Sequence, residues 1–73
     1  MITVYVLEGE RRYVGITCDL DRRVREHRSS SHSGKLIGRF HVLYREPFND
    51  YSAARQREKF LKSGAGRAWL LRK

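Results

Sequence analysis

Two strand-like segments near the N-terminus, separated by a short turn, constrain the fold more than any other feature of this sequence. Residues 2–7 (ITVYVL) and 12–17 (RYVGIT) are rich in β-branched and aromatic side chains, which favour strands. Residues 8–10 (EGE) are typical of a tight turn, so the two segments are predicted to form a hairpin. A three-residue loop places Tyr5 opposite Tyr13 on one face and the aliphatic side chains of both strands on the other face.

The rest of the first two thirds of the chain predicts one helix and one further strand. Asp19 is a good N-cap for a helix that runs from Leu20 to about Arg28, because its carboxylate can accept hydrogen bonds from the first turn. Residues 41–44 (HVLY) predict a third strand, extended a little on either side.

Two more helices are predicted near the C-terminus. Asp50 or Ser52 can cap a helix that continues to Lys62, and residues 64–66 (GAG) are expected to end it. Residues 67–71 then form a short last helix. The predicted order is therefore β-β-α-β-α-α, an α+β arrangement in one domain over residues 1–73.

Positive charge is concentrated after the hairpin. The net charge is +8. Residues 1–21 carry two basic and four acidic groups, residues 22–45 carry seven and one, and residues 46–73 carry seven and three. Twelve of the 16 basic residues are arginine, whose planar guanidinium matches phosphate oxygens well. A polyanion, most plausibly nucleic acid, is the expected partner, and a solvated basic surface is the plainer alternative.

The first predicted helix places charged groups on its apolar stripe. Leu20, Arg23, Val24 and His27 follow the spacing i, i+3, i+4, i+7 and share one face. Helix geometry likewise places a carboxylate, Glu58, within the apolar stripe of the second helix, where it needs a cation or a metal ion as partner. A structural ion pair between Arg23 and Glu58, or a satisfied core histidine at position 27, would also account for these residues.

These residues resemble the motifs of the GIY-YIG nuclease domain, which is the catalytic module of excision-repair incision nucleases and homing endonucleases. Residues 3–5 (TVY) and 13–15 (YVG) stand at its two tyrosine motifs. The helix motifs are matched by Leu20, Arg23 and His27, and by Ala54, Glu58, Leu61 and Lys62. The resemblance implies a small three-stranded antiparallel sheet flanked by helices, and metal-dependent cleavage of DNA.

The resemblance also implies a role for each matching residue. Glu58 would ligate Mg²⁺ or Mn²⁺, and Arg23 would contact the scissile phosphate. One of Tyr5 and Tyr13 would deprotonate the attacking water while the other positions it, and the sequence does not decide between them. His27 would support the tyrosine by hydrogen bonding.

The predicted partner is DNA, with RNA as an alternative. The cations expected to contact phosphates, without a base-reading pattern, are Arg22, Arg25, Arg28, Lys35 and Arg39. We expect a monomer that nicks one strand, and a dimer on substrate where both strands are cut. A non-catalytic nucleic-acid-binding module is the second hypothesis. The unpaired Cys18 and the lack of a secretory signal or a long apolar run predict a cytoplasmic protein without membrane contact.

Overall fold

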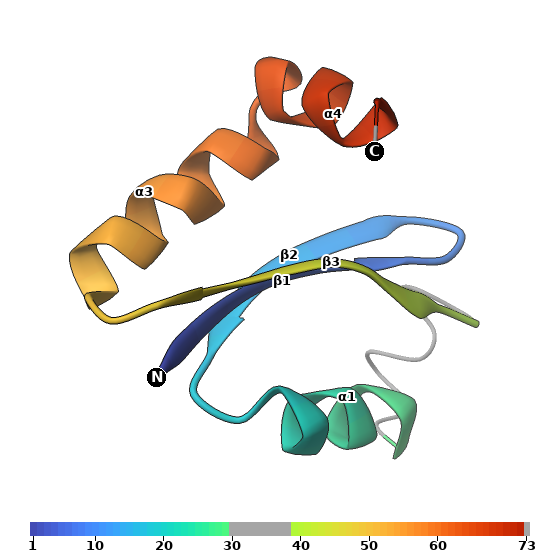
Figure 1. Cartoon of the computed structure of the whole chain (residues 1–73). Coiled ribbons are helices and arrows are strands. Elements are labelled where there is room, and N and C mark those ends of the chain that lie inside the picture. Colours follow the sequence, from blue (N-terminus) through green and yellow to red (C-terminus); the bar gives the residue numbers. More distant parts are fainter. Residues whose placement is uncertain (30–38, 73) are drawn as a thin grey trace.

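The sheet lies between two layers of helices. The computed structural model describes residues 1–29 and 39–72. Within them the three strands form one antiparallel sheet in the order β2-β1-β3. The helix α1 covers one face of this sheet, and α3 and α4 cover the other (Figure 1). The elements are β1 (Ile2–Glu8), β2 (Arg12–Thr17), α1 (Leu20–Ser29), β3 (His41–Phe48), α3 (Tyr51–Lys62) and α4 (Gly64–Leu71). The predicted α+β class and element order are confirmed.

The central strand β1 is buried on both faces, because each face is covered by helices. Its residues 4–7 have no solvent-exposed surface. Val4 and Val6 pack with Ala54, Leu61 and Leu70 from α3 and α4. On the opposite face, the side chains of Tyr5 and Leu7 pack with those of Leu20, Val24 and Phe40. The predicted separation of the aliphatic face from the tyrosine face is therefore confirmed.

The register of the hairpin differs from the prediction by one step. Glu8 pairs with Arg12, and the Arg12 Nη2 atom lies 2.9 Å from the Glu8 Oε2 atom. This cross-strand ion pair extends the ladder, so the three-residue loop is 9–11 and not 8–10. As a result Tyr5 lies opposite Gly15, and Tyr13 lies opposite Leu7. The two tyrosines still share a face, because side chains alternate with a period of two residues.

The third strand is longer than predicted and contains a bulge. Val6 pairs with Tyr44 and Leu7 with Val42, which leaves Leu43 as an extra residue. Leu43 and Tyr44 both pack against the α3 and α4 core, as expected where a bulge interrupts the alternation. Strand β3 also includes Pro47, which is tolerated because β3 lies at an edge of the described sheet.

The start of the last helix was predicted wrongly. Residues 64–66 do not end α3 but begin α4, and only Ser63 separates the two helices. The Ser63 side chain accepts a hydrogen bond from the Gly66 backbone N–H at 3.2 Å, as an N-cap does. Glycine is required at position 66 because a Cβ atom there would lie 2.0 Å from the carbonyl oxygen of Phe60. At the other end of α3, Asp50 is the N-cap.

None of the helices in the described ranges has the length and apolarity that a membrane crossing requires.

Candidate active site

Tyr5 occupies the centre of the sheet and is held there by its partner across the hairpin. Its side chain has 0% of its surface exposed. A Cβ atom on Gly15 would lie 2.6 Å from the Tyr5 Oη atom and 2.7 Å from Cζ. The phenol therefore lies directly over Gly15, and any larger residue at position 15 would displace it.

Tyr13 lies beside Tyr5 but is open to solvent. The two ring centroids are 6.1 Å apart. Tyr13 comes from β2, at an edge of the described sheet, and it is 37% exposed. The pair thus combines one buried phenol with one that solvent can reach.

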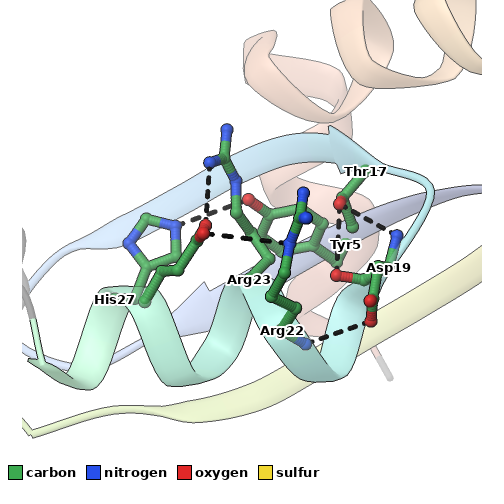
Figure 2. Close-up of polar contacts among 7 residues, drawn as sticks. Tyr5, Thr17, Asp19, Arg22, Arg23 and His27 are labelled. Carbon is green, nitrogen blue, oxygen red and sulfur yellow. Dashed lines mark hydrogen bonds and ion pairs between the residues drawn. The ribbon is translucent and has the colours of Figure 1, made fainter.

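The turn from β2 into α1 fixes the position of the helix. The Thr17 hydroxyl accepts a hydrogen bond from the Asp19 N–H at 3.1 Å, and the Asp19 carboxylate accepts one from the Arg22 N–H at 3.1 Å. Asp19 is therefore the N-cap, as predicted. Figure 2 shows this turn and the side chains of Arg23 and His27 that α1 presents beside Tyr5.

His27 lies against both tyrosines. It is 7% exposed, its Nε2 atom is 3.4 Å from the Tyr5 Oη atom, and its ring centroid is 4.8 Å from that of Tyr13. Its Nδ1 atom is buried and makes no hydrogen bond to any described residue. His27 is therefore not a core histidine with both ring nitrogens hydrogen-bonded, as far as residues 1–29 and 39–72 are concerned.

Burial and neighbouring charge set the protonation of this group. Burial, assisted by the nearby Tyr13, raises the pKa of Tyr5 to about 12. Burial and then the positive charge of Arg23 lower the pKa of His27 below its ordinary value. At neutral pH the imidazole is therefore uncharged and the Tyr5 phenol keeps its proton.

Arg23 lies at the rim of the site and not inside it, contrary to the inward orientation that its helical position predicted. Its side chain is 46% exposed, and its Nη1 atom is 3.2 Å from the Glu26 Oε1 atom. A hydrogen bond to Tyr5, followed by the one to Glu26, raises the pKa of Arg23. The long side chain leaves the packed surface of α1 while its guanidinium remains near the phenols, which is common for arginine.

Glu58 lies in a cleft along the edge of β2, formed with α3 and α4. The cleft has a volume of about 620 Å³, and both Glu58 and Tyr13 line it. The Glu58 side chain is 17% exposed and its Oε2 atom is 3.2 Å from the Lys62 Nζ atom. The expected partner for this carboxylate is thus a lysine one turn later. The alternative of an Arg23–Glu58 ion pair is not formed, because each residue pairs within its own helix.

The donor set around Glu58 suits a hard cation that keeps most of its own ligands. Among residues 1–29 and 39–72, no group of three or more His, Cys, Asp and Glu side chains could hold a metal ion. Mg²⁺ is commonly bound by one or two carboxylates together with waters and substrate phosphates. A single carboxylate in an open cleft fits that mode, whereas it does not fit a structural metal with four protein ligands.

Comparison with known proteins identifies the family. The family model of the GIY-YIG catalytic domain matches residues 1–69. The chain belongs to this family. Membership in the GIY-YIG family implies a nuclease, that is, a phosphodiesterase that acts on nucleic acid. Nucleases of the GIY-YIG family generally use a divalent metal ion.

One similar protein comes from Haloquadratum walsbyi. It is UPF0213 protein HQ_3675A, which is 41% identical to this GIY-YIG chain over 64 residues. The matched region covers 82% of this chain and 72% of that protein. No solved structure matches the chain at a significant level.

The cations nominated for DNA contact lie mostly on the exposed side of α1. Arg22, Arg25 and Arg28 are exposed on α1, and Arg39 is exposed just before β3. Arg28 lies over the ring of Phe40, with 5.0 Å from its Cζ atom to the ring centroid. Lys35 lies outside the residues that the structure describes. The described cations thus flank the Tyr5 face of this GIY-YIG domain.

Sequence reasoning missed two residues that shape the site. Glu26 pairs with Arg23 and also lies 3.8 Å from Arg22, and its spacing of three and four residues from these arginines was a visible signal. Lys62 was noted only as part of a motif, although it follows Glu58 by four residues. Both omissions concern local helix pairs that moderate the charge of the candidate site.

Proposed function

We propose that this chain is a metal-dependent endonuclease that hydrolyses phosphodiester bonds in DNA, with a preference for structure over sequence. One observation carries the proposal: Tyr13 lies beside Tyr5 and His27 and also lines the cleft that contains Glu58. The groups that the chemistry needs, a base and a metal-binding carboxylate, thus border one open space that a phosphate can enter.

Tyr13 is the tyrosine best placed to accept a proton from the attacking water. It is the exposed member of the pair, whereas Tyr5 is completely buried and its pKa is raised to about 12 by that burial. The guanidinium of Arg23 lies close enough to interact with both phenols. Tyr5 and His27 then hold the ring of Tyr13 in place from the buried side.

Arg23 is assigned to the scissile phosphate. A half-exposed guanidinium at the rim can turn from Glu26 to a phosphate without leaving a buried charge behind, because the Arg23–Glu26 pair is solvent-exposed and contributes little stability. Its contact would stabilise the negative charge that develops on the phosphate oxygens during attack.

Glu58 is assigned to the metal ion. When bound, a divalent cation supplies positive charge for the phosphate and the leaving oxygen. The carboxylate is largely shielded, and the exposed Lys62 ammonium that pairs with it is flexible enough to move aside. Lys62 therefore balances the charge of Glu58 in the free protein.

The exposed arginines of α1 support DNA as the substrate. They lie on the helix that covers the Tyr5 face and have no pattern that would read base edges, so phosphate contacts and a steep salt dependence are expected. Nicked, flapped and branched DNA are the substrates to compare, and RNA is the alternative polymer.

A non-catalytic binding module is the second candidate function. It is favoured by the Glu58–Lys62 ion pair, which satisfies the carboxylate without a metal, and by the lack of a multi-residue metal cluster among the described residues. This module would bind the same DNA through the arginines of α1 and leave it intact.

Cleavage assays with substitutions separate the two candidates. Labelled nicked, flapped and branched DNA is incubated with Mg²⁺, with Mn²⁺ and with EDTA. The nuclease proposal predicts cleavage that requires metal and is lost in Glu58→Gln and Arg23→Ala. Glu10→Gln, at an exposed turn residue, should cut like the wild type, and Arg22→Ala should weaken binding without abolishing cleavage. Binding by the wild type without cleavage under any of these conditions would support the module.

A further inference from the structure

The cleft that contains Glu58 is larger than a metal site needs. Its volume of about 620 Å³ lies within the range of ordinary ligand pockets. Its apolar lining consists of Val14 from β2, Leu61 from α3 and Leu70 from α4. Leu61 and Leu70 are only 1% and 3% exposed, so the partly exposed Val14 supplies most of the apolar surface that the sugar of a bound nucleotide could reach.

Three cations from three different elements border the same cleft. They are Arg12 on β2, Lys62 on α3 and Arg67 on α4, against the single carboxylate of Glu58. Arg12 is held by Glu8 through its Nε and Nη2 atoms. Lys62 pairs with Glu58 over 3.2 Å, and its side chain is 57% exposed, so its ammonium also faces the open cleft. Arg67 is exposed and forms no ion pair within the described part of the chain.

The cleft is continuous with the candidate active site through Tyr13. Helix α1, which carries Arg22, Arg25 and Arg28, covers one face of the sheet, and α3 and α4 cover the other face (Figure 1). Lys62 belongs to α3 and Arg67 to α4. Strand β2 separates these two surfaces and lies at an edge of the described sheet. A strand of nucleic acid that reaches Tyr13 from the α1 side can therefore pass around this edge into the cleft.

We propose that the cleft binds a nucleotide unit adjacent to the scissile phosphate, with Arg67 and Lys62 contacting its backbone phosphate and the apolar lining contacting its sugar. This inference deepens the proposed nuclease function and rests on it for the identity of the strand as substrate. It assigns to α4 a binding role besides that of covering the core with Leu70.

The test measures binding without cleavage. A fluorescently labelled single-stranded DNA oligonucleotide is titrated with protein in EDTA at several salt concentrations. Affinity falls as salt rises, and each phosphate contact on a single strand adds about 0.7 to the absolute slope of log K against log salt. We expect Arg67→Gln to lower this slope by about 0.7 and Arg67→Lys to preserve it. Arg72→Gln removes the same charge from the end of α4, outside the cleft, and should leave the slope unchanged.

Competitors distinguish a polymer from a free small anion. Inorganic phosphate and a 5′-mononucleotide are added separately to the same complex. Weak competition by both supports a subsite for a strand, whereas displacement at concentrations equimolar with the oligonucleotide would overturn this assignment in favour of a free phosphate compound. Equal slopes for Arg67→Gln and Arg72→Gln would overturn the phosphate contact itself.

The result can be separated from the outcome for nuclease function. If Arg67→Gln reduces the salt dependence of binding but the wild type never cleaves DNA, the binding subsite stands and the catalytic proposal is rejected. If the wild type cleaves DNA with metal but Arg67→Gln and Arg72→Gln show the same salt dependence of binding, the nuclease function stands and the subsite is rejected.

Discussion

Replacing Gly15 by alanine tests whether the hairpin fixes the position of the Tyr5 phenol. The added Cβ atom would lie 2.6 Å from the Tyr5 Oη atom, 2.7 Å from Cζ and 2.9 Å from the Tyr13 Cε1 atom. Carbon atoms in proteins normally approach to about 3.5–4.0 Å. The Tyr5 phenol must therefore move by about 1 Å to relieve the contact.

The movement has a cost in both stability and activity. Tyr5 is fully buried, and overpacking of this kind typically costs about 1–3 kcal/mol of folding free energy. A misplacement of about 1 Å can lower the rate about 100-fold even when the displaced residue acts only by positioning another group, as Tyr5 is proposed to position Tyr13. We expect Gly15→Ala to show both effects. Under conditions where the variant is fully folded, its cleavage rate should still be lower than that of the wild type.

Urea unfolding and the cleavage rate measure these two quantities on the same protein. Gly64→Ala is the matched control, because a Cβ atom at Gly64 meets nothing within 4 Å and alanine favours a helix by up to about 1 kcal/mol. The control should be as stable as the wild type or more stable, and as active. A Gly15→Ala variant with the stability and rate of the wild type would refute the claim that Gly15 positions the phenol.

Further predictions concern the tyrosines, His27 and the core. Tyr13→Phe should abolish cleavage while binding persists, and Tyr5→Phe should retain part of the rate; the reverse order would assign the base to Tyr5. Since the pKa of His27 is lowered in the folded state, its contribution to stability is present above about pH 6.5 and is lost as the pH falls below it. Between about pH 7.5 and about pH 5.5, the free energy of unfolding by urea should therefore fall more for the wild type than for His27→Gln. Equal decreases would contradict the lowered pKa of His27. Leu61→Ala should cost about 2–5 kcal/mol by urea unfolding, whereas the exposed Leu71→Ala should cost less than about 0.5 kcal/mol; similar costs would mean that α3 is not anchored as described.

Features set by local patterns could be predicted from the sequence. The two strands of the hairpin, the Asp19 cap and the helix that follows depend on residue types and spacing within a few positions. The shared face of Tyr5 and Tyr13 requires only an odd number of loop residues, and the predicted loop 8–10 and the observed loop 9–11 both have three. The apolar stripe of α3 likewise predicted that Glu58 would be shielded and paired.

Features set by contacts between elements could not be predicted in the same way. The hairpin register depends on the Glu8–Arg12 pair across the strands, which adds one step to the ladder. The start of α4 depends on the close approach of Gly66 to Phe60, and a pattern of glycines alone indicates a break. Arg23 shares a helical face with buried residues, yet its length takes the guanidinium to the rim.

The central claim is that Glu58 and Tyr13, from opposite sides of the sheet edge, border one metal-dependent site. Paramagnetic broadening of backbone amide signals by Mn²⁺ tests it most directly, in the presence of a cleavage-resistant oligonucleotide. The account predicts that Mn²⁺ broadens the signals of Tyr13 and Val14 in the wild type, and that Glu58→Gln abolishes this effect. Signals of Tyr13 that stay sharp, or that broaden equally in Glu58→Gln, would contradict it.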